Sequence, residues 1–316
     1  MPPRPQRSWP WLLVLLSTSA AAQISVSTTT LTMPDCPASN PVFVDVYRPP
    51  GAGPFPTVAL GHGFVMGKGT MEGLGRALAE AGILTVAPEF PALGNCGDSD
   101  HARNGRILLA ALDQQAALGL VDGARVGVGG HSAGGLSALL AAGQRAMQVV
   151  VLLDPVDSNG EGLAQAATVL APTFFINAEP SVCSAQNNSA PWYAPKPAPK
   201  ARLRVVGSNH CEPEEPLNPL CTLTCGATWT SERAAKFKTY ASAFFDRYLL
   251  GHSAPCLEQT ATADPGVADV DFELETCVNA GARPPAAGSG CGCAGAPAAA
   301  GWALLFALLW RRKSGA

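Results

Sequence analysis

The sequence predicts an α/β fold with a mostly parallel central sheet and helices on both faces. Segments with strand character alternate along the chain with segments long enough for helices, the order that produces parallel sheets. One of them, residues 148–153, is an almost continuous apolar run, as expected of a strand buried on both faces. Without its two ends the chain keeps about 250 residues, enough for one large domain with a substantial core.

The first half of the chain carries several of these elements. Residues 42–47 alternate and then stop at a Pro-Pro pair, which predicts an early antiparallel strand. Thr70 is expected to cap a helix that ends at Gly82. The other expected elements are strands over residues 55–60, 83–87 and 125–128 and a helix over about residues 101–118.

The second half continues the alternation. Strands are expected over residues 148–153, 173–176 and 202–206, the last of which we take as the final strand. Residues 231–250 predict an amphipathic helix, whose apolar stripe we assign to the core. The stripe consists of Phe237, Tyr240, Ala241, Phe244 and Tyr248.

The most informative motif is Gly130-His-Ser-Ala-Gly134, which lies between an expected strand and an expected short helix ending at Gly143. Glycines on both sides of Ser132 allow a sharp strand-to-helix turn that holds the hydroxyl above the sheet edge. The helix start directs free N–H groups and the positive end of its dipole at the same point, where an oxyanion would form. The motif therefore predicts that Ser132 is the nucleophile of a hydrolase.

A serine nucleophile needs a base, and the base needs a carboxylate that holds its tautomer. In the order serine, acid, histidine, only His210 and His252 lie downstream. His210 lies in the loop directly after the strand at 202–206 and is the expected base. His252 is instead expected to interact with the C-terminal end of the last helix. We expect structural roles for His131 and His62.

The acid has several candidates. Asp154 ends the strand at 148–153, and Glu179 follows the strand at 173–176. Either strand end can face the histidine, and Asp157 is a third candidate.

Over about residues 40–250 the chain resembles the α/β-hydrolase superfamily and is most similar to chlorophyllase-like and polyester-hydrolase-like esterases. The resemblance implies an α/β-hydrolase fold. In polyester hydrolases the acid position matches Ser181, which cannot act as an acid here. Chlorophyllases and some lipases use the aspartate of an Asp-Pro pair, which matches Asp154-Pro155. The resemblance therefore favours Asp154, with Glu179 as the alternative.

The oxyanion hole is expected to combine two backbone N–H groups. One comes from Ala133, directly after the nucleophile. The other comes from Phe64, because the loop Gly61-His-Gly-Phe64 matches the His-Gly-aromatic loop of the family.

Both ends of the chain predict export. Residues 1–22 have the charged, apolar and small-residue regions of a signal peptide. A Gly-Cys motif around Cys291 and Cys293, an apolar run at 296–310 and a basic end together resemble the MYXO-CTERM sorting tail of myxobacterial surface proteins. This resemblance implies processing near those cysteines and display at the cell surface; a simple membrane tail is the alternative. The expected division is a signal peptide at 1–22, a hydrolase domain with a C-terminal extension at 23–280, a linker at 281–290 and a sorting or membrane tail at 291–316.

Eight further cysteines in an exported chain indicate disulfides. We expect a local bridge between Cys256 and Cys277 and a partner for Cys211 in the segment from Cys221 to Cys225. A zinc site built from Cys221 and Cys225 with His210 is the competing interpretation.

Together these features predict a monomeric serine hydrolase that cleaves an uncharged small or polymeric carboxylic ester without a metal or organic cofactor. A net charge of −3 with 14% charged residues argues against nucleic-acid binding. Two alternatives stay open: a peptidase or acyltransferase with the same triad, and a non-catalytic surface-binding module.

Overall fold

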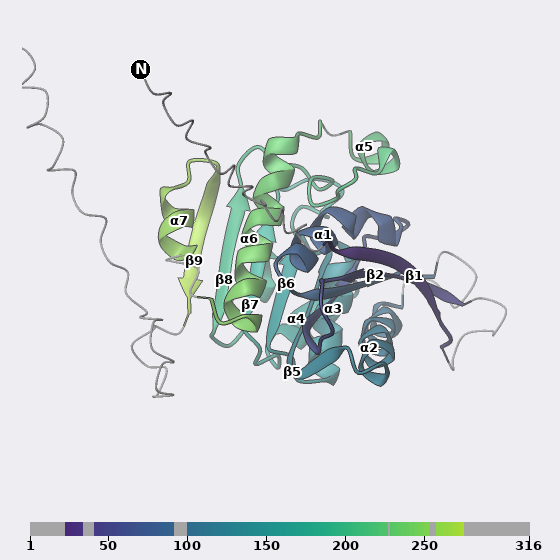
Figure 1. Ribbon diagram of the computed structural model, residues 1–316. Coiled ribbons are helices and arrows are strands. Elements are labelled where there is room, and N and C mark those ends of the chain that lie inside the picture. Colours follow the sequence, from purple (N-terminus) through teal and green to yellow (C-terminus); the bar gives the residue numbers. More distant parts are fainter. Residues whose placement is uncertain (1–22, 34–40, 92–99, 227, 253–256, 275–316) are drawn as a thin grey trace, which may run out of the picture.

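The computed structural model describes residues 23–33, 41–91, 100–226, 228–252 and 257–274. Within these ranges a nine-stranded sheet forms the centre of the molecule, in the order β1-β2-β4-β3-β5-β6-β7-β8-β9 (Figure 1). The strands are β1 (Ser25–Leu31), β2 (Val42–Arg48), β3 (Phe55–Gly61), β4 (Leu84–Pro88), β5 (Val121–His131), β6 (Val149–Leu153), β7 (Thr173–Asn177), β8 (Lys200–Val205) and β9 (Val267–Glu273).

The strands from β3 to β8 pair in parallel, and the antiparallel strands lie at the two edges. β1 pairs with β2 and β2 with β4 in antiparallel register at one edge, and β9 pairs antiparallel with β8 at the other. The central pairs, β4 to β3 and on through β8, are parallel. The predicted α/β fold with a mostly parallel sheet is confirmed, as is the early antiparallel strand.

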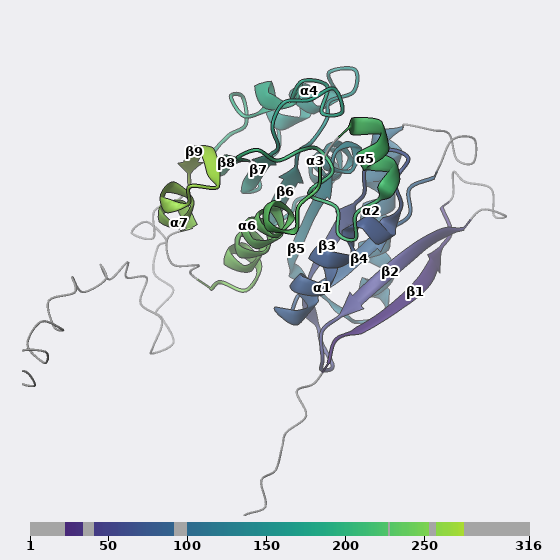
Figure 2. The same cartoon turned by 90° about the horizontal axis from the view of Figure 1, so that it is seen from above.

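Helices cover both faces of this sheet (Figures 1 and 2). One face carries α1 (Glu72–Glu80), α6 (Ser231–Leu249) and α7 (Leu257–Ala263), and the other carries α2 (His101–Ala117), α3 (Ala133–Gln144) and α4 (Glu161–Ala166). A short helix, α5 (Pro219–Cys225), belongs to the long connection between β8 and α6.

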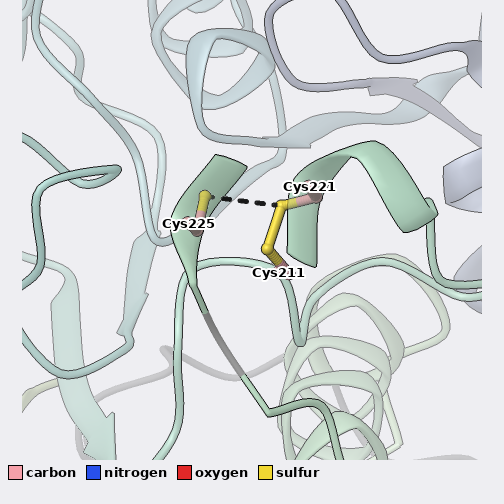
Figure 3. A group of neighbouring side chains, drawn as sticks. All are labelled: Cys211, Cys221 and Cys225. Atoms are coloured by element: carbon pink, nitrogen blue, oxygen red, sulfur yellow. Dashed lines mark hydrogen bonds between the residues drawn. A yellow bond between two sulfur atoms is a disulfide. The ribbon is translucent and has the colours of Figure 1, made fainter. Parts of the chain in front are cut away.

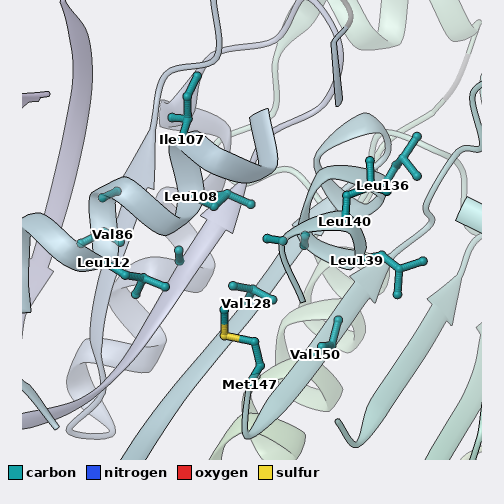
Figure 4. Close-up of a cluster of buried hydrophobic side chains, with 14 of the residues drawn as sticks. Val86, Ile107, Leu108, Leu112, Val128, Leu136, Leu139, Leu140, Met147 and Val150 are labelled. Carbon is teal, nitrogen blue, oxygen red and sulfur yellow. The ribbon is translucent and has the colours of Figure 1, made fainter. Parts of the chain in front are cut away.

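Each face has its own hydrophobic core. Under α2 and α3, Leu108 and Leu139 pack with strand residues such as Val128 and Val150 (Figure 4). On the opposite face the predicted stripe of α6 lies in the second core, with Phe237, Tyr240, Ala241 and Phe244 buried and Tyr248 partly buried. The sheet is thus buried on both sides, which explains the apolar runs of its central strands.

Several element boundaries differ from the expectations. β5 begins at Val121, earlier than expected, and β9 follows the strand that was expected to be last. Thr70 does not cap a helix: it lies inside the 3-10 turn η1 (Lys68–Met71), and its hydroxyl donates to the carbonyl of Gly67 at 2.9 Å. The elements β1, α4, α5, α7 and β9 were not predicted.

In the described part of the chain, no helix combines the length and hydropathy needed to cross a membrane. The expected signal peptide at 1–22, the linker at 281–290 and the tail at 291–316 lie outside the described residues, as do Cys256 and Cys277.

Candidate active site

Ser132 alone forms the turn between strand β5, which ends at His131, and helix α3, which begins at Ala133. Its backbone has φ 55° and ψ −122°, a combination that non-glycine residues rarely adopt. Its N–H donates to the carbonyl of Leu153 at 3.0 Å, and its own carbonyl accepts from the N–H of Gly135 at 3.0 Å. Hydrogen bonds to two neighbouring elements therefore hold this strained conformation.

The glycines around Ser132 are required by contact between backbones. A Cβ atom on Gly134 would lie 2.3 Å from the carbonyl oxygen of Gly61, and one on Gly130 would lie 2.4 Å from the carbonyl oxygen of Gly134. Neither position has room for a side chain unless the backbone moves. The contact packs the start of α3 against the end of β3, beside the loop that follows β3.

Three predicted residues meet beyond this turn. The Oγ of Ser132 lies 2.9 Å from Nε2 of His210, and Nδ1 of His210 lies 2.6 Å from Oδ2 of Asp154. Asp154 is fully buried, and its Oδ1 accepts from the N–H of Ala178 at 2.9 Å. Because the carboxylate only accepts, Nδ1 carries the proton and leaves Nε2 free to accept from the serine hydroxyl. Serine, base and acid stand in the order that nucleophilic catalysis requires.

The other carboxylates considered for the acid are engaged elsewhere. Glu179 forms an ion pair with Arg204 and accepts from the N–H of Gly207 at 3.0 Å. Asp157 accepts from the ring N–H of Trp192 at 2.8 Å. The structure brings only Asp154, among these candidates, to the histidine.

The loop that follows β3 reaches the serine. A Cβ atom on Gly63 would lie 3.5 Å from the Cβ of Ser132, so the backbone just before Phe64 passes directly beside Ser132. Ala133 is the first residue of α3, where a helix has free N–H groups. The structure therefore places both predicted oxyanion donors, Phe64 and Ala133, next in sequence to residues at the site.

Histidine His62 holds this loop in place. Its Nδ1 donates to the carbonyl of Gly63 at 2.8 Å, and its Nε2 accepts from the N–H of Phe90 at 2.8 Å. Burial lowers the pKa of His62, which keeps the ring neutral, as this pair of bonds requires. His252 lies far along the chain at the end of α6 and donates to Asp246 at 3.0 Å.

Two buried residues next to the site were not predicted to act together. His131 was expected to be structural, and Glu214 was not singled out. The Nε2 of His131 donates to the main-chain carbonyl of His210 at 2.7 Å, and its Nδ1 lies 3.6 Å from Oε1 of Glu214. The sequence signal was the acidic run Glu212-Pro-Glu-Glu215, which follows the predicted base by two residues.

Two disulfides hold the segment that follows His210. Cys211 is bonded to Cys221, as expected (Figure 3). Cys183 is bonded to Cys225. The sulfurs of Cys221 and Cys225 are 3.9 Å apart, so the two bridges lie side by side. These sulfurs are not thiolates in the structure, whereas the alternative zinc site would need thiolate ligands.

Comparisons with known proteins find esterases. Residues 17–228 match the model of a family described as PET hydrolase-like. Cutinase est2 of Thermobifida alba is 28% identical over 178 residues, covering 53% of this chain and 57% of the cutinase. The bis(hydroxyethyl) terephthalate hydrolase of Streptomyces coelicolor is 28% identical over 169 residues, covering 51% of this chain and 52% of that enzyme. The matches thus span just over half the length of these curated relatives.

A solved structure supports the fold. The ferulic acid esterase from Streptomyces cinnamoneus superposes with a TM-score of 0.62 at 20% sequence identity, covering 79% of this chain and 97% of that one. At this level of identity the likeness indicates a shared α/β-hydrolase fold.

Proposed function

Because the chain belongs to the PET hydrolase-like family, we propose that it is a serine hydrolase that cleaves carboxylic esters. The observation that carries the proposal is the continuous chain of short contacts from Ser132 through His210 to Asp154, at 2.9 and 2.6 Å. Such a chain makes a serine hydroxyl nucleophilic near neutral pH.

In the proposed reaction, the Oγ of Ser132 attacks the ester carbonyl carbon while His210 takes the hydroxyl proton. The oxyanion accepts hydrogen bonds from the N–H groups of Ala133 and Phe64. His210 then passes its proton to the departing alcohol as the ester C–O bond breaks, which leaves an acyl-serine. Water, deprotonated by His210, cleaves this intermediate and restores the hydroxyl. Asp154 stabilises the imidazolium at both stages.

The proposed substrate is an uncharged carboxylic ester, either small or polymeric. The family match and the cutinase and terephthalate-ester hydrolase relatives support an ester of this class. The small net charge of the chain agrees with a neutral substrate. The proposal requires no metal and no organic cofactor, because the side chains of the triad supply the nucleophile and both proton transfers.

We also propose that the protein works outside the cytoplasm as a monomer. Two disulfides in the described part of the chain support an oxidising compartment. Export would use residues 1–22 as a signal peptide, the hydrolase domain would span 23–280, and the linker at 281–290 would lead to a surface-sorting or membrane tail at 291–316.

The test compares four proteins in hydrolysis of p-nitrophenyl acetate and in labelling by a fluorophosphonate probe. Ser132→Ala should abolish labelling, and Asp154→Asn should lower kcat by about 10⁴-fold, as in other triads. Glu179→Gln, which changes a carboxylate paired with Arg204, serves as the matched control and should keep most of the wild-type rate. Hydrolysis by Ser132→Ala at the wild-type rate would refute the proposal. Loss of activity in Glu179→Gln, with activity retained in Asp154→Asn, would instead assign the role of the acid to Glu179.

A further inference from the structure

A buried pair, His131 and Glu214, lies directly behind the candidate base. Both side chains are shielded from solvent, with relative exposures of 1% and 0%. Nδ1 of His131 and Oε1 of Glu214 face each other at 3.6 Å, and neither atom has a hydrogen-bond partner among the described residues. Leaving a buried polar atom without a hydrogen-bond partner costs free energy. Two such atoms that face each other therefore indicate that a proton lies between them.

The bond on the other side of the His131 ring determines what faces Glu214. The carbonyl oxygen of His210 can only accept, so Nε2 of His131, 2.7 Å away, must carry a proton. In the neutral ring Nδ1 then presents a lone pair to the carboxyl group. Two acceptors repel each other unless one proton lies between them. The pair therefore needs one shared proton, held either as the Glu214 carboxylic acid or as the Nδ1–H of His131.

The ring of His131 lies against two parts of the proposed active site, the base His210 and the oxyanion loop. The rings of His131 and His210 lie 4.7 Å apart, and a Cβ atom on Gly63 of the oxyanion loop would be 3.3 Å from Nδ1 of His131. Glu214 is itself anchored, because its Oε2 accepts from the N–H of Asn218 at 3.2 Å. The position of His210 thus depends on the ring of His131, and the position of that ring depends on Glu214.

We propose that Glu214 and His131 are positioning residues of the hydrolase: they share one proton and thereby hold the main chain of His210, and so its ring, against Ser132. This inference rests on the proposed function, since it concerns the base of that reaction.

The electrostatic surroundings assign the proton to the carboxyl group. Burial raises the pKa of Glu214 to about 7 and lowers the pKa of His131 well below its usual value. The titratable neighbours are His210 and His62, and positive charge on either of them further disfavours a cationic His131. As the pH rises through this range the pair releases its proton to solvent, two acceptors face each other, and the hold on His210 loosens. The apparent pKa belongs to the pair, not to either residue.

The test uses Glu214→Gln and Glu214→Leu, with Glu215→Gln as the matched control. Glu215 is the next carboxylate along the chain, but it is partly exposed and pairs with Lys238 at 2.6 Å. A glutamine amide donates to Nδ1 of His131 at every pH. Glu214→Gln should therefore match the wild-type kcat below about pH 7, where the wild-type pair holds its proton, and should lack the fall in kcat that we expect of the wild type as the pH rises through about 7. Leucine cannot donate, and Glu214→Leu should lower kcat about 10- to 100-fold through misplacement of the base, with KM little changed. Glu215→Gln should follow the wild type.

A second measurement does not depend on turnover. In the Ser132→Ala protein, the ¹⁵N chemical shift of His131 Nδ1 should change with pH as the pair releases its proton, and Glu214→Gln should abolish that change. Superimposable kcat profiles for wild type and Glu214→Gln, or a Nδ1 shift that ignores residue 214, would overturn the inference. Those outcomes leave Ser132-dependent hydrolysis intact, whereas failure of the proposed function would appear as activity or probe labelling that survives Ser132→Ala.

Discussion

The two hydrogen bonds of His62 run in opposite directions: the ring donates to the loop beside the nucleophile and accepts from the chain after β4. Only the neutral ring with its proton on Nδ1 makes both bonds. His62 thus ties the loop that carries one proposed oxyanion donor to the chain that follows β4.

We therefore predict that His62→Ala lowers kcat for p-nitrophenyl esters about 10- to 100-fold and changes KM less, since the oxyanion donors act mainly in the transition state. Steady-state kinetics measures both constants. His252→Ala, at an exposed histidine that pairs with Asp246, is the control and should retain the wild-type kcat. Equal loss in the two variants would show that the loop does not depend on His62.

At the scale of single residues, the local sequence was enough to predict Ser132 and His210 as site residues, because the turn around Ser132 and the loop that contains His210 can each be recognised from adjacent residues. The resemblance was needed to choose Asp154. Glu214 could not be found, since a glutamate in a polar loop is usually exposed, and only the packing of that loop against β5 and η1 buries it.

At the scale of elements, the connection from β8 to α6 positions the proposed base, His210. Disulfide bonds as well as packing hold this connection. Glu212 is fully buried here and accepts from the main chain at Asn209 and Thr230 and from Arg233. The bridge from Cys211 to Cys221 closes a loop of ten positions immediately after the histidine.

Removing this bridge in a Cys211→Ser/Cys221→Ser protein should destabilise the fold by about 3 kcal/mol on chain-entropy grounds and lower kcat in addition. The bridge from Cys183 to Cys225 spans 42 positions. Its removal should destabilise the fold more, by about 4 kcal/mol. For the same loss of stability it should lower kcat less than removal of the first bridge does, because neither of its cysteines adjoins His210. Thermal unfolding and kinetics on both variants separate the two effects. The same loss of kcat in both would contradict a local role for the first bridge.

The elements that could be predicted are those whose sequence reflects burial. The central strands β3, β4 and β6 are buried at every residue and read as apolar runs. The edge strands β1 and β9 are largely exposed or half-buried, with polar residues such as Thr28 and Asp271 along them, and so lack that signal. Short helices such as α5 owe their existence to the bridges and packing around them, which the sequence does not display.

At the scale of the whole molecule, the two cores bury ionisable groups as well as hydrocarbon. Burial lowers the pKa of His101, at the start of α2, and of His62. In the unfolded chain both rings take up protons at about pH 6.5, whereas in the folded protein they remain neutral to a lower pH. Unfolding therefore binds protons between these values, so their contribution to stability is fully present above about pH 6.5 and is lost as the pH falls towards the folded-state pKa values.

We predict that His101→Asn makes the free energy of unfolding less dependent on pH below about pH 6.5, with a slope smaller by up to about 1.4 kcal/mol per pH unit. Urea denaturation at a series of pH values gives the slope. Glu214 contributes with the opposite sign, because its raised pKa stabilises the fold at low pH and that contribution is lost as the pH rises through about 7. An unchanged slope in His101→Asn would show that this histidine does not link folding to protons.

The backbone contact among Gly61, Gly130 and Gly134 sets a boundary for engineering. Three segments meet there backbone against backbone, with the ring of Phe90 also beside Gly61, so a side chain added at any one position has no room unless the backbone moves. Mutant libraries aimed at new ester substrates should keep these three codons fixed and place their diversity in exposed loop positions such as Phe64 and Val65. A selection that recovered side chains at the glycines would require a different backbone turn at Ser132, the proposed nucleophile.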